Sequence, residues 1–302
     1  FYTTHCLSAL DDTCIPGYRR VANACHQHGC KVFGQVFHPG REVIDLLDGA
    51  ATVAYAPSAV PSDRFHVMPR PFSRGLIGDV VTGYGDGAVR MQEAGLDGIE
   101  IVASHGYLPA QFLNPRVNLR DDEYGGSFEN RLRFLREVIA EIRSRVSDMV
   151  IGMRISGDEK DPEGLKDEEA FAACEALDSD GELDYFNVIA GSSASLGGAI
   201  HIVPPMAVET GYVAPYAAAV KSRVSKPVFV AGRINQPQIA EQVLTSGQAD
   251  VCGMTRAMIC DPEIGNKAKV GRADDIRACI GCNQACIGHF HLGFPISCIQ
   301  HP

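Results

Sequence analysis

The chain has 302 residues, which is enough for one large α/β domain or two modest ones. Hydrophobic residues make up 45% of the chain and charged residues 21%, an ordinary composition for a globular protein. The formal net charge of −10 and the lack of a basic stripe argue against nucleic acid as a partner. No apolar run approaches the length of a membrane span, so we expect no membrane partner either.

Helical and strand-like segments alternate along the chain. Apolar strands are predicted at 31–37, 98–103, 150–156, 185–191, 227–233 and 250–256, and helices at 17–29, 79–95, 127–146, 167–177, 214–224 and 236–247. The helix at 127–146 has the clearest amphipathic spacing, and Ser127 stands where an N-cap belongs.

Most of these strands are continuous apolar runs, which is typical of strands buried on both faces of a parallel sheet. The sequence therefore predicts an α/β protein with a (β/α)8 TIM barrel. Only six strands are visible where a closed barrel needs eight, so we expect a barrel that lacks its first strands, in a fragment of a longer chain. An open six-stranded sheet is the alternative. We expect the barrel to occupy residues 1–270 and a cluster-binding segment to occupy 271–302.

The eleven cysteines fall into two groups. Most are scattered, and for these we expect small buried side chains in a reducing cytoplasm. The last four, with the spacing C-x2-C-x3-C-x11-C, are Cys279, Cys282, Cys286 and Cys298. Four sulfur ligands suit an iron–sulfur cluster or zinc. The tight triplet with one remote thiol favours a [4Fe–4S] cluster, because structural zinc usually takes two separated pairs.

The active site of a parallel barrel lies at the carboxyl ends of its strands. Gly232-Arg233 and Gly253 with Arg256 stand at the last two of these ends. Glycine lets backbone N–H groups approach a ligand and arginine adds a fork of donors, so these residues predict a phosphate site. A turn glycine followed by a surface arginine is the structural alternative.

His105 and Tyr107 follow the strand at 98–103 and are two residues apart, so both can point toward one pocket. An imidazole and a phenol together offer proton transfer or hydrogen bonding to a substrate. A histidine at such a place can also be purely structural. Gln35 and Arg154 lie in two other strands of the predicted barrel.

The segment HGYLPAQFLNPRVNLRDDEYGGSFENRLRF at 105–134 resembles the signature of the Old Yellow Enzyme family of NADH:flavin oxidoreductases. GQVFHPGR at 34–41 resembles the segment that carries that family's flavin-facing glutamine, and CIGCNQAC resembles its iron–sulfur branch. That branch includes trimethylamine dehydrogenase, 2,4-dienoyl-CoA reductase and N-methylproline or dimethylglycine demethylases. The match extends over almost the whole chain.

The resemblance implies FMN at the barrel mouth. Gln35 would bond the pyrimidine edge of the flavin, and Arg154 would lie near N1 and the C2 oxygen, where negative charge develops on reduction. The FMN phosphate would be held by Gly232, Arg233, Gly253 and Arg256. The four-cysteine cluster would accept electrons one at a time. NAD(P)H or FAD would bind through C-terminal domains that this chain lacks.

The substrate is less clearly indicated. Val102 stands where the trimethylamine enzyme has a tyrosine, and the chain contains no Trp for an aromatic cage around a cation. GSSASLGGAIHIVPPM at 191–206 looks closest to the N-methylproline/dimethylglycine demethylases, and its histidine, His201, does not align with that of the dienoyl-CoA reductases. Arg41 and His201 are candidates for binding a substrate carboxylate.

We therefore expect an FMN- and iron–sulfur-dependent oxidoreductase that demethylates a small N-methylated amine or amino acid. His105 and Tyr107 would position the substrate and manage its amine proton. The alternatives are an NAD(P)H-dependent 2,4-dienoyl-CoA or enoate reductase, and a non-catalytic redox module. Beyond the small-molecule substrate, we expect a homo-oligomer and an electron-transfer partner.

Overall fold

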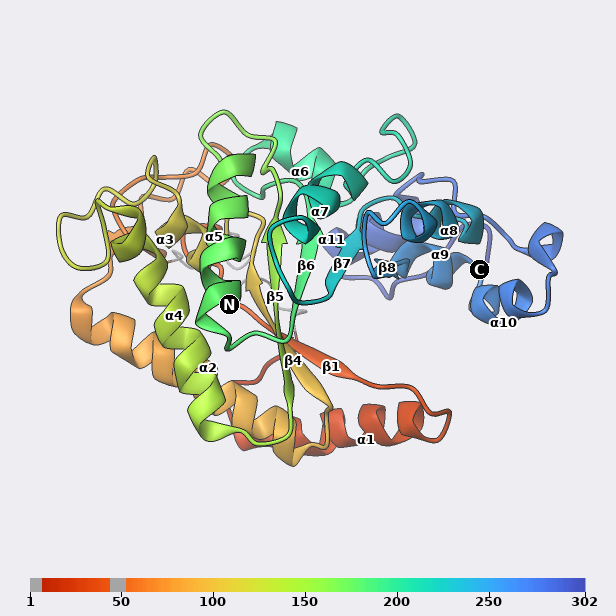
Figure 1. Ribbon diagram of the computed structural model, residues 1–302, viewed down its shortest axis with the longest axis horizontal. Coiled ribbons are helices and arrows are strands. Elements are labelled where there is room, and N and C mark those ends of the chain that lie inside the picture. The colour runs from red at the N-terminus through yellow and green to blue at the C-terminus, as the bar shows by residue number, and fades with distance from the viewer. Residues whose placement is uncertain (1–6, 44–52, 302) are drawn as a thin grey trace.

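The computed structural model describes residues 7–43 and 53–301 (Figure 1). Its main element is a six-stranded parallel sheet in the order β1-β4-β5-β6-β7-β8. The strands are β1 (Phe33–Val36), β4 (Gly98–Ala103), β5 (Val150–Ser156), β6 (Tyr185–Ile189), β7 (Val228–Ala231) and β8 (Val251–Gly253). The short strands β2 (Tyr55–Ala56) and β3 (Arg70–Pro71) form a separate pair.

Helices connect successive strands and follow one another around the sheet (Figure 1). The main helices are α1 (Ile15–His26), α2 (Arg74–Glu93), α4 (Phe128–Arg145), α5 (Asp167–Asp180), α7 (Ala214–Lys221) and α8 (Pro237–Thr245). The shorter ones are α3 (Leu108–Leu113), α6 (Leu196–Ile202), α9 (Thr255–Cys260), α10 (Ile264–Lys269) and α11 (His289–Leu292), with single turns at η1 (Asp12–Cys14), η2 (Ala273–Asp275) and η3 (Gln284–Gly288). Of the helices described, none is both long and apolar enough to cross a bilayer.

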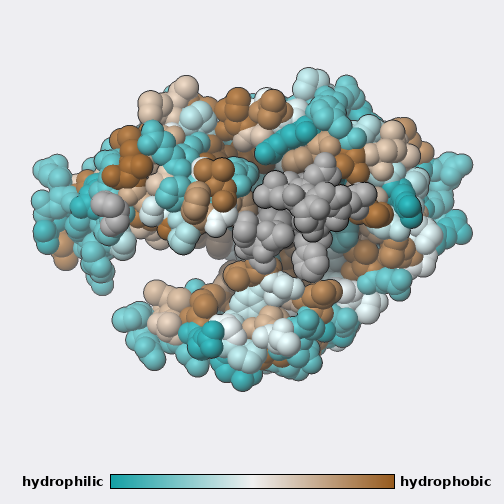
Figure 2. All heavy atoms as spheres, turned by 180° about the vertical axis from the view of Figure 1, so that it is seen from behind, coloured by the Kyte–Doolittle hydropathy of each residue, from teal (hydrophilic) through white to brown (hydrophobic). Residues whose placement is uncertain are grey.

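The sheet follows chain order and remains open between β1 and β8 in the described part of the chain. Seen from behind, the surface is notched at one side (Figure 2). This arrangement is a TIM-barrel-like half-barrel, and it confirms the predicted parallel sheet and its six strands. The short helices α3 and α6 were not predicted, because helices of six and seven residues are too short to give a clear periodicity.

Helix α4 forms as its sequence predicts. The Ser127 hydroxyl accepts a hydrogen bond from the Asn130 backbone N–H at 3.3 Å, which satisfies one of the free donors of the first turn. The inward stripe Leu132, Leu135, Val138, Ile139 and Ile142 is buried. Each such side chain contributes roughly 1.5–3 kcal/mol by leaving water. The packed helix layer holds the strands in place and thereby positions the residues at their carboxyl ends.

Candidate functional site

A buried glutamate joins the two residues that the sequence predicts at the flavin ring. Glu100 of β4 lies beside Gln35 of β1 in the strand register, and its side chain is 6% exposed. Its Oε1 accepts from Gln35 Nε2 and from Arg154 Nε, the latter at 2.8 Å. Its Oε2 accepts from Tyr185 Oη at 3.0 Å and Asn187 Nδ2 at 2.8 Å. Glu100 was not among the predicted site residues, although a single acid in an otherwise apolar strand was a signal for it.

The ionised form of Glu100 is favoured by this network. Burial opposes ionisation, but the Arg154 charge and the hydrogen-bond donors outweigh it and hold the pKa of Glu100 below its ordinary value. Glu100 is therefore a carboxylate at neutral pH, and it fixes the side chains of Gln35 and Arg154 on the inner face of the sheet.

His105 and Tyr107 emerge together from the end of β4. The backbone N–H of His105 donates to Ser156 Oγ at 3.1 Å, and its ring Nδ1 lies 3.4 Å from the Gly191 carbonyl oxygen. The centroids of the two rings are 5.9 Å apart, with the rings nearly perpendicular. Burial, followed by the Arg154 charge, lowers the pKa of His105 to about 3. His105 is therefore a neutral imidazole in this site.

A second buried glutamate holds the turn between these two residues. Glu159 Oε1 accepts from the Gly106 N–H, and its Oε2 accepts from the Leu165 N–H, both at 2.8 Å. Burial raises the pKa of Glu159 to about 7. His105 and Gly106 both have positive φ, 59° and 73°, so a left-handed turn is fixed at this strand end. Backbone strain of this kind clusters at functional sites.

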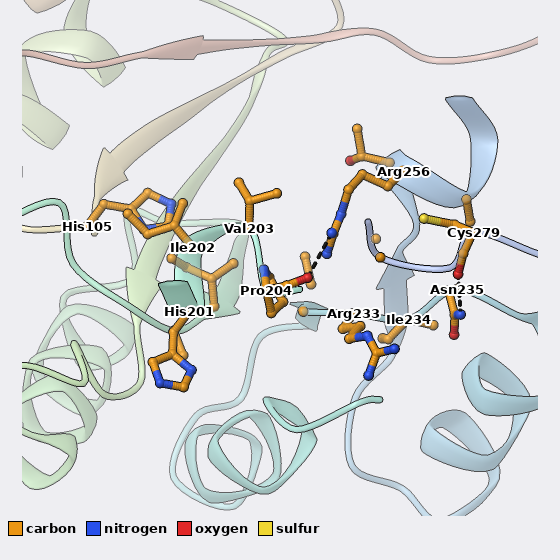
Figure 3. Close-up of a pocket in the computed structure, with 18 of the residues that line it drawn as sticks. His105, His201, Ile202, Val203, Pro204, Arg233, Ile234, Asn235, Arg256 and Cys279 are labelled. Atoms are coloured by element: carbon orange, nitrogen blue, oxygen red, sulfur yellow. Dashed lines mark hydrogen bonds between the residues drawn. The ribbon is translucent and has the colours of Figure 1, made fainter. Parts of the chain in front are cut away.

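The four predicted phosphate-site residues line one cavity of about 270 Å³: Gly232, Arg233, Gly253 and Arg256 (Figure 3). Arg233 has a φ of 47°, and its buried Nε has no hydrogen-bond partner among the described residues. Arg256 Nη1 donates to the Pro204 carbonyl oxygen at 2.8 Å. An orphaned donor and a second guanidinium on one cavity wall fit a phosphate group.

The two glycines of this cavity also have a packing reason. A Cβ atom on Gly232 would lie 2.2 Å from a methyl group of Val213, and one on Gly253 would lie 2.9 Å from the Cβ of Ala231. Neither position has space for a side chain without movement of its neighbours.

The four cysteines of the C-terminal motif line one small cavity: Cys279, Cys282, Cys286 and Cys298. The short π-helix η3 carries Cys286, and such helices are frequent at functional sites. In the described residues, no three His, Cys, Asp or Glu side chains converge closely enough for a single metal ion. The donor set itself, four thiols around one cavity, suits an iron–sulfur cluster or zinc.

The cysteine segment is fastened to the barrel next to the phosphate-like cavity. Asn235 Nδ2 donates to the Cys279 carbonyl oxygen at 2.7 Å (Figure 3), and Asn283 Oδ1 accepts from Arg256 Nη1 at 2.7 Å. Cys279 and Arg256 line both the phosphate-like cavity and the cysteine cavity. The two cavities therefore share a wall.

A fifth cysteine lies beside the motif. Cys260 ends α9 and is fully buried. Of the other scattered cysteines in the described residues, only Cys174 is buried as expected, whereas Cys30 is exposed and Cys14, Cys25 and Cys252 are half-buried. Burial, followed by its interaction with Cys298, raises the pKa of Cys260 to about 12. This contact could not be predicted from the sequence, because Cys260 lies outside the cysteine motif.

A larger cavity of about 750 Å³ continues from the phosphate-like one, and His105 and Arg154 line both. Gln35, Val102 and Tyr107 line it as well. The structure thus brings the predicted flavin-ring residues and the predicted catalytic residues to one space at the strand ends. Its volume is typical of small-molecule sites.

The two residues considered for a substrate carboxylate lie elsewhere. Arg41 is buried, and its guanidinium donates to Glu42 Oε1 at 3.1 Å and to the carbonyl oxygens of Val60 and Pro61. It is a structural residue that holds its loop. His201 lines the phosphate-like cavity and not the larger one (Figure 3).

Comparison with known proteins decides the family. The model of the NADH:flavin oxidoreductase / NADH oxidase family matches residues 4–275. The chain belongs to this family. Its TIM-barrel-like fold agrees with the family, as the resemblance of its motifs implies.

Three similar proteins illustrate the range of the family. The chain is 39% identical over 291 residues to a metal reductase of Desulforamulus reducens, and 37% identical over 292 residues to an N,N-dimethylglycine/sarcosine dehydrogenase of Chromohalobacter salexigens. Each alignment covers 96% of this chain and 42% of the relative. A solved 2-naphthoyl-CoA reductase superposes with a TM-score of 0.88 at 28% identity, covering 97% of this chain and 46% of that one. The chain thus spans less than half the length of these proteins.

Proposed function

We propose that this chain is the FMN- and [4Fe–4S]-binding part of an oxidoreductase that demethylates a small N-methylated amine or amino acid. The observation that carries the proposal is the wall that the phosphate-like and cysteine cavities share through Cys279 and Arg256. Asn283 and Ile287 of the cysteine segment also line the larger cavity, where the redox-active ring would lie, so the ring and the cluster would be close enough to exchange electrons. Residues 1–270 would form the flavin barrel and 271–302 the cluster segment.

Different residues would bind the phosphate and the ring of the cofactor. Arg233 and Arg256 would bind the phosphate, and Gln35 and Arg154, held by Glu100, would contact the flavin ring. When bound, FMN would accept a hydride from the N-methyl carbon of the substrate and pass the electrons to the cluster. Addition of water to the oxidised substrate then yields formaldehyde and the demethylated amine.

The charge of the site helps the substrate to react. An amine donates hydride only from its neutral form, so the substrate ammonium must lose a proton. Among the described residues, no Asp or Glu lines the larger cavity, so no carboxylate of its wall stabilises an ammonium charge there. The neutral His105 ring and the Tyr107 phenol would then orient the nitrogen by hydrogen bonding without adding charge.

The N,N-dimethylglycine/sarcosine dehydrogenase at 37% identity supports this substrate class. A second candidate is an NAD(P)H-dependent 2,4-dienoyl-CoA or enoate reductase, which would use the flavin in the opposite direction. The Tyr107 phenol in the cavity favours it, because a phenol can protonate the α-carbon of an unsaturated thioester. The solved 2-naphthoyl-CoA reductase supports the same alternative.

Anaerobic bleaching of the flavin distinguishes the demethylase from the reductase. The full-length protein is mixed under argon with N-methylproline, with dimethylglycine, or with NADPH and a dienoyl-CoA, and the flavin absorbance is followed. Rapid bleaching by an N-methyl amino acid with release of formaldehyde supports the demethylase. Bleaching by NADPH alone, with reoxidation by the dienoyl-CoA, would overturn it in favour of the reductase.

A further inference from the structure

The larger cavity contains a positive charge, that of Arg64, which no ion pair of the described residues balances, in a protein whose net charge is negative. The chain carries a formal net charge of −10, yet among the described residues the cavity is lined by Arg64, His105, Arg154 and His291 and by no Asp or Glu. Much of the remaining wall is apolar, including Phe37, Leu196, Ile200 and Phe290. Such a lining disfavours a plain cation and suits an apolar body that carries a negative group.

Arg64 lines this cavity from the loop between β2 and β3. Its backbone N–H donates to the Ala194 carbonyl oxygen at 3.0 Å, and its guanidinium carbon lies 4.9 Å from the ring centroid of Phe65. The side chain is half-buried, and no carboxylate of the described residues forms an ion pair with it. Arg154, by contrast, is already paired with Glu100. Arg64 is thus the cavity arginine whose charge is not balanced by a carboxylate of the described residues and can pair with a ligand.

His291 faces the same cavity from the cluster segment. It lies in α11, between the third and fourth motif cysteines, whereas Arg64 lies in the loop between β2 and β3. Both side chains line this cavity. Burial and the Arg64 charge lower the pKa of His291, which favours its neutral imidazole form. A guanidinium fork beside an imidazole N–H offers the donors that a planar carboxylate accepts.

We propose that Arg64 and His291 form the subsite that binds the carboxylate of the substrate. The pair lines the same cavity as Gln35, Arg154 and Tyr107, the residues of the proposed flavin and reacting site. An N-methylated amino acid whose carboxylate is bound by the pair would present its N-methyl group to the reacting centre. This inference rests on the proposed function. It adds that the substrate carries a negative group, and it names the residues that select for that group. It also replaces Arg41 and His201, which lie outside this cavity.

The test is a pair of ligands of equal shape and different charge. Benzoate and benzamide are titrated into the full-length holoenzyme by calorimetry. A charge-assisted hydrogen bond contributes roughly 1.5–3 kcal/mol, which corresponds to about 10- to 100-fold in affinity. We expect benzoate to bind at least about tenfold more tightly than benzamide, and Arg64→Met to abolish that difference. Arg64→Lys, which keeps the charge and loses the fork, should retain part of it.

Arg70→Met serves as the matched control, because Arg70 is exposed and does not line the cavity. It should leave the preference unchanged, and His291→Phe should reduce it. Equal binding of the two ligands by the wild-type protein would overturn the proposal. The proposal would also be overturned by an Arg64→Met protein that retains its flavin spectrum and still prefers benzoate. It would equally be overturned if Arg64→Met lowered the affinity for free coenzyme A and left the affinity for benzoate unchanged.

Neither ligand donates a hydride, so this result does not depend on the reaction. If N-methyl amino acids fail to bleach the flavin while the benzoate preference and its loss in Arg64→Met persist, the proposed function fails and the carboxylate subsite stands.

Discussion

Glu100 offers the sharpest test of how the flavin site is built. Its two carboxylate oxygens accept four hydrogen bonds, from Gln35, Arg154, Tyr185 and Asn187. In Glu100→Gln the amide oxygen can still accept two of these bonds, but the amide nitrogen is a donor and opposes the others. The substitution also removes the charge that offsets Arg154.

The expected cost follows from these losses. Each buried donor left without an acceptor costs roughly 1–3 kcal/mol, and breaking a fully buried ion pair costs about 3–5 kcal/mol. The side chain of Arg154 is 25% exposed, so water replaces part of the lost interaction. We expect Glu100→Gln to lower the free energy of unfolding by about 2–4 kcal/mol and to weaken FMN binding, because Gln35 and Arg154 lose their common anchor.

Urea unfolding of the apoprotein measures the first effect, and fluorescence titration with FMN measures the second. Glu93→Gln is the matched control, because Glu93 is exposed at the end of α2. If Glu100→Gln unfolds at the same urea concentration as Glu93→Gln and binds FMN as tightly, the network does not anchor the site and the reasoning is wrong.

Three further predictions concern the turn, the reacting groups and the cluster. Burial raises the pKa of Glu159 from 4.5 to about 7, so the folded state binds the Glu159 proton more tightly than the unfolded state. The contribution of this proton to stability is therefore full below pH 4.5 and is lost as the pH rises through about 7. The wild-type free energy of unfolding should therefore fall over this range, and Glu159→Gln should fall less; an unchanged slope contradicts this. Tyr107→Phe should slow flavin reduction by N-methylproline by about 10²- to 10⁴-fold if the phenol exchanges protons with the substrate, with normal FMN content; an unchanged rate removes Tyr107 from the reaction. Cys282→Ser should lose most of the protein-bound iron and keep its FMN; retention of full iron content contradicts the proposed ligand set.

The sheet and its main helices could be predicted from the sequence because their signals are local. The strands at 98–103 and 150–156 coincide with β4 and β5, and the helix at 127–146 matches α4 within a residue at each end. Continuous apolar runs correctly indicated a parallel sheet, and the number of strands indicated an incomplete barrel.

The site could be predicted only in part, since much of it depends on contacts between distant segments. The strand ends predicted Gln35 and Arg154, but the carboxylate that joins them is visible only once β1, β4 and β5 are in register. Arg64 and His291 are 227 positions apart by their residue numbers, 291 − 64, and no motif marks either one. Their proximity follows from the docking of the cysteine segment on the barrel.

The cofactor content of the full-length protein, purified under argon, tests the central claim most directly. The account predicts one FMN, with about four iron and four sulfide per chain. It also predicts a visible spectrum in which flavin absorbance is superimposed on the broad absorbance of an iron–sulfur cluster. A colourless protein with zinc as its only metal would contradict the proposed FMN and iron–sulfur content.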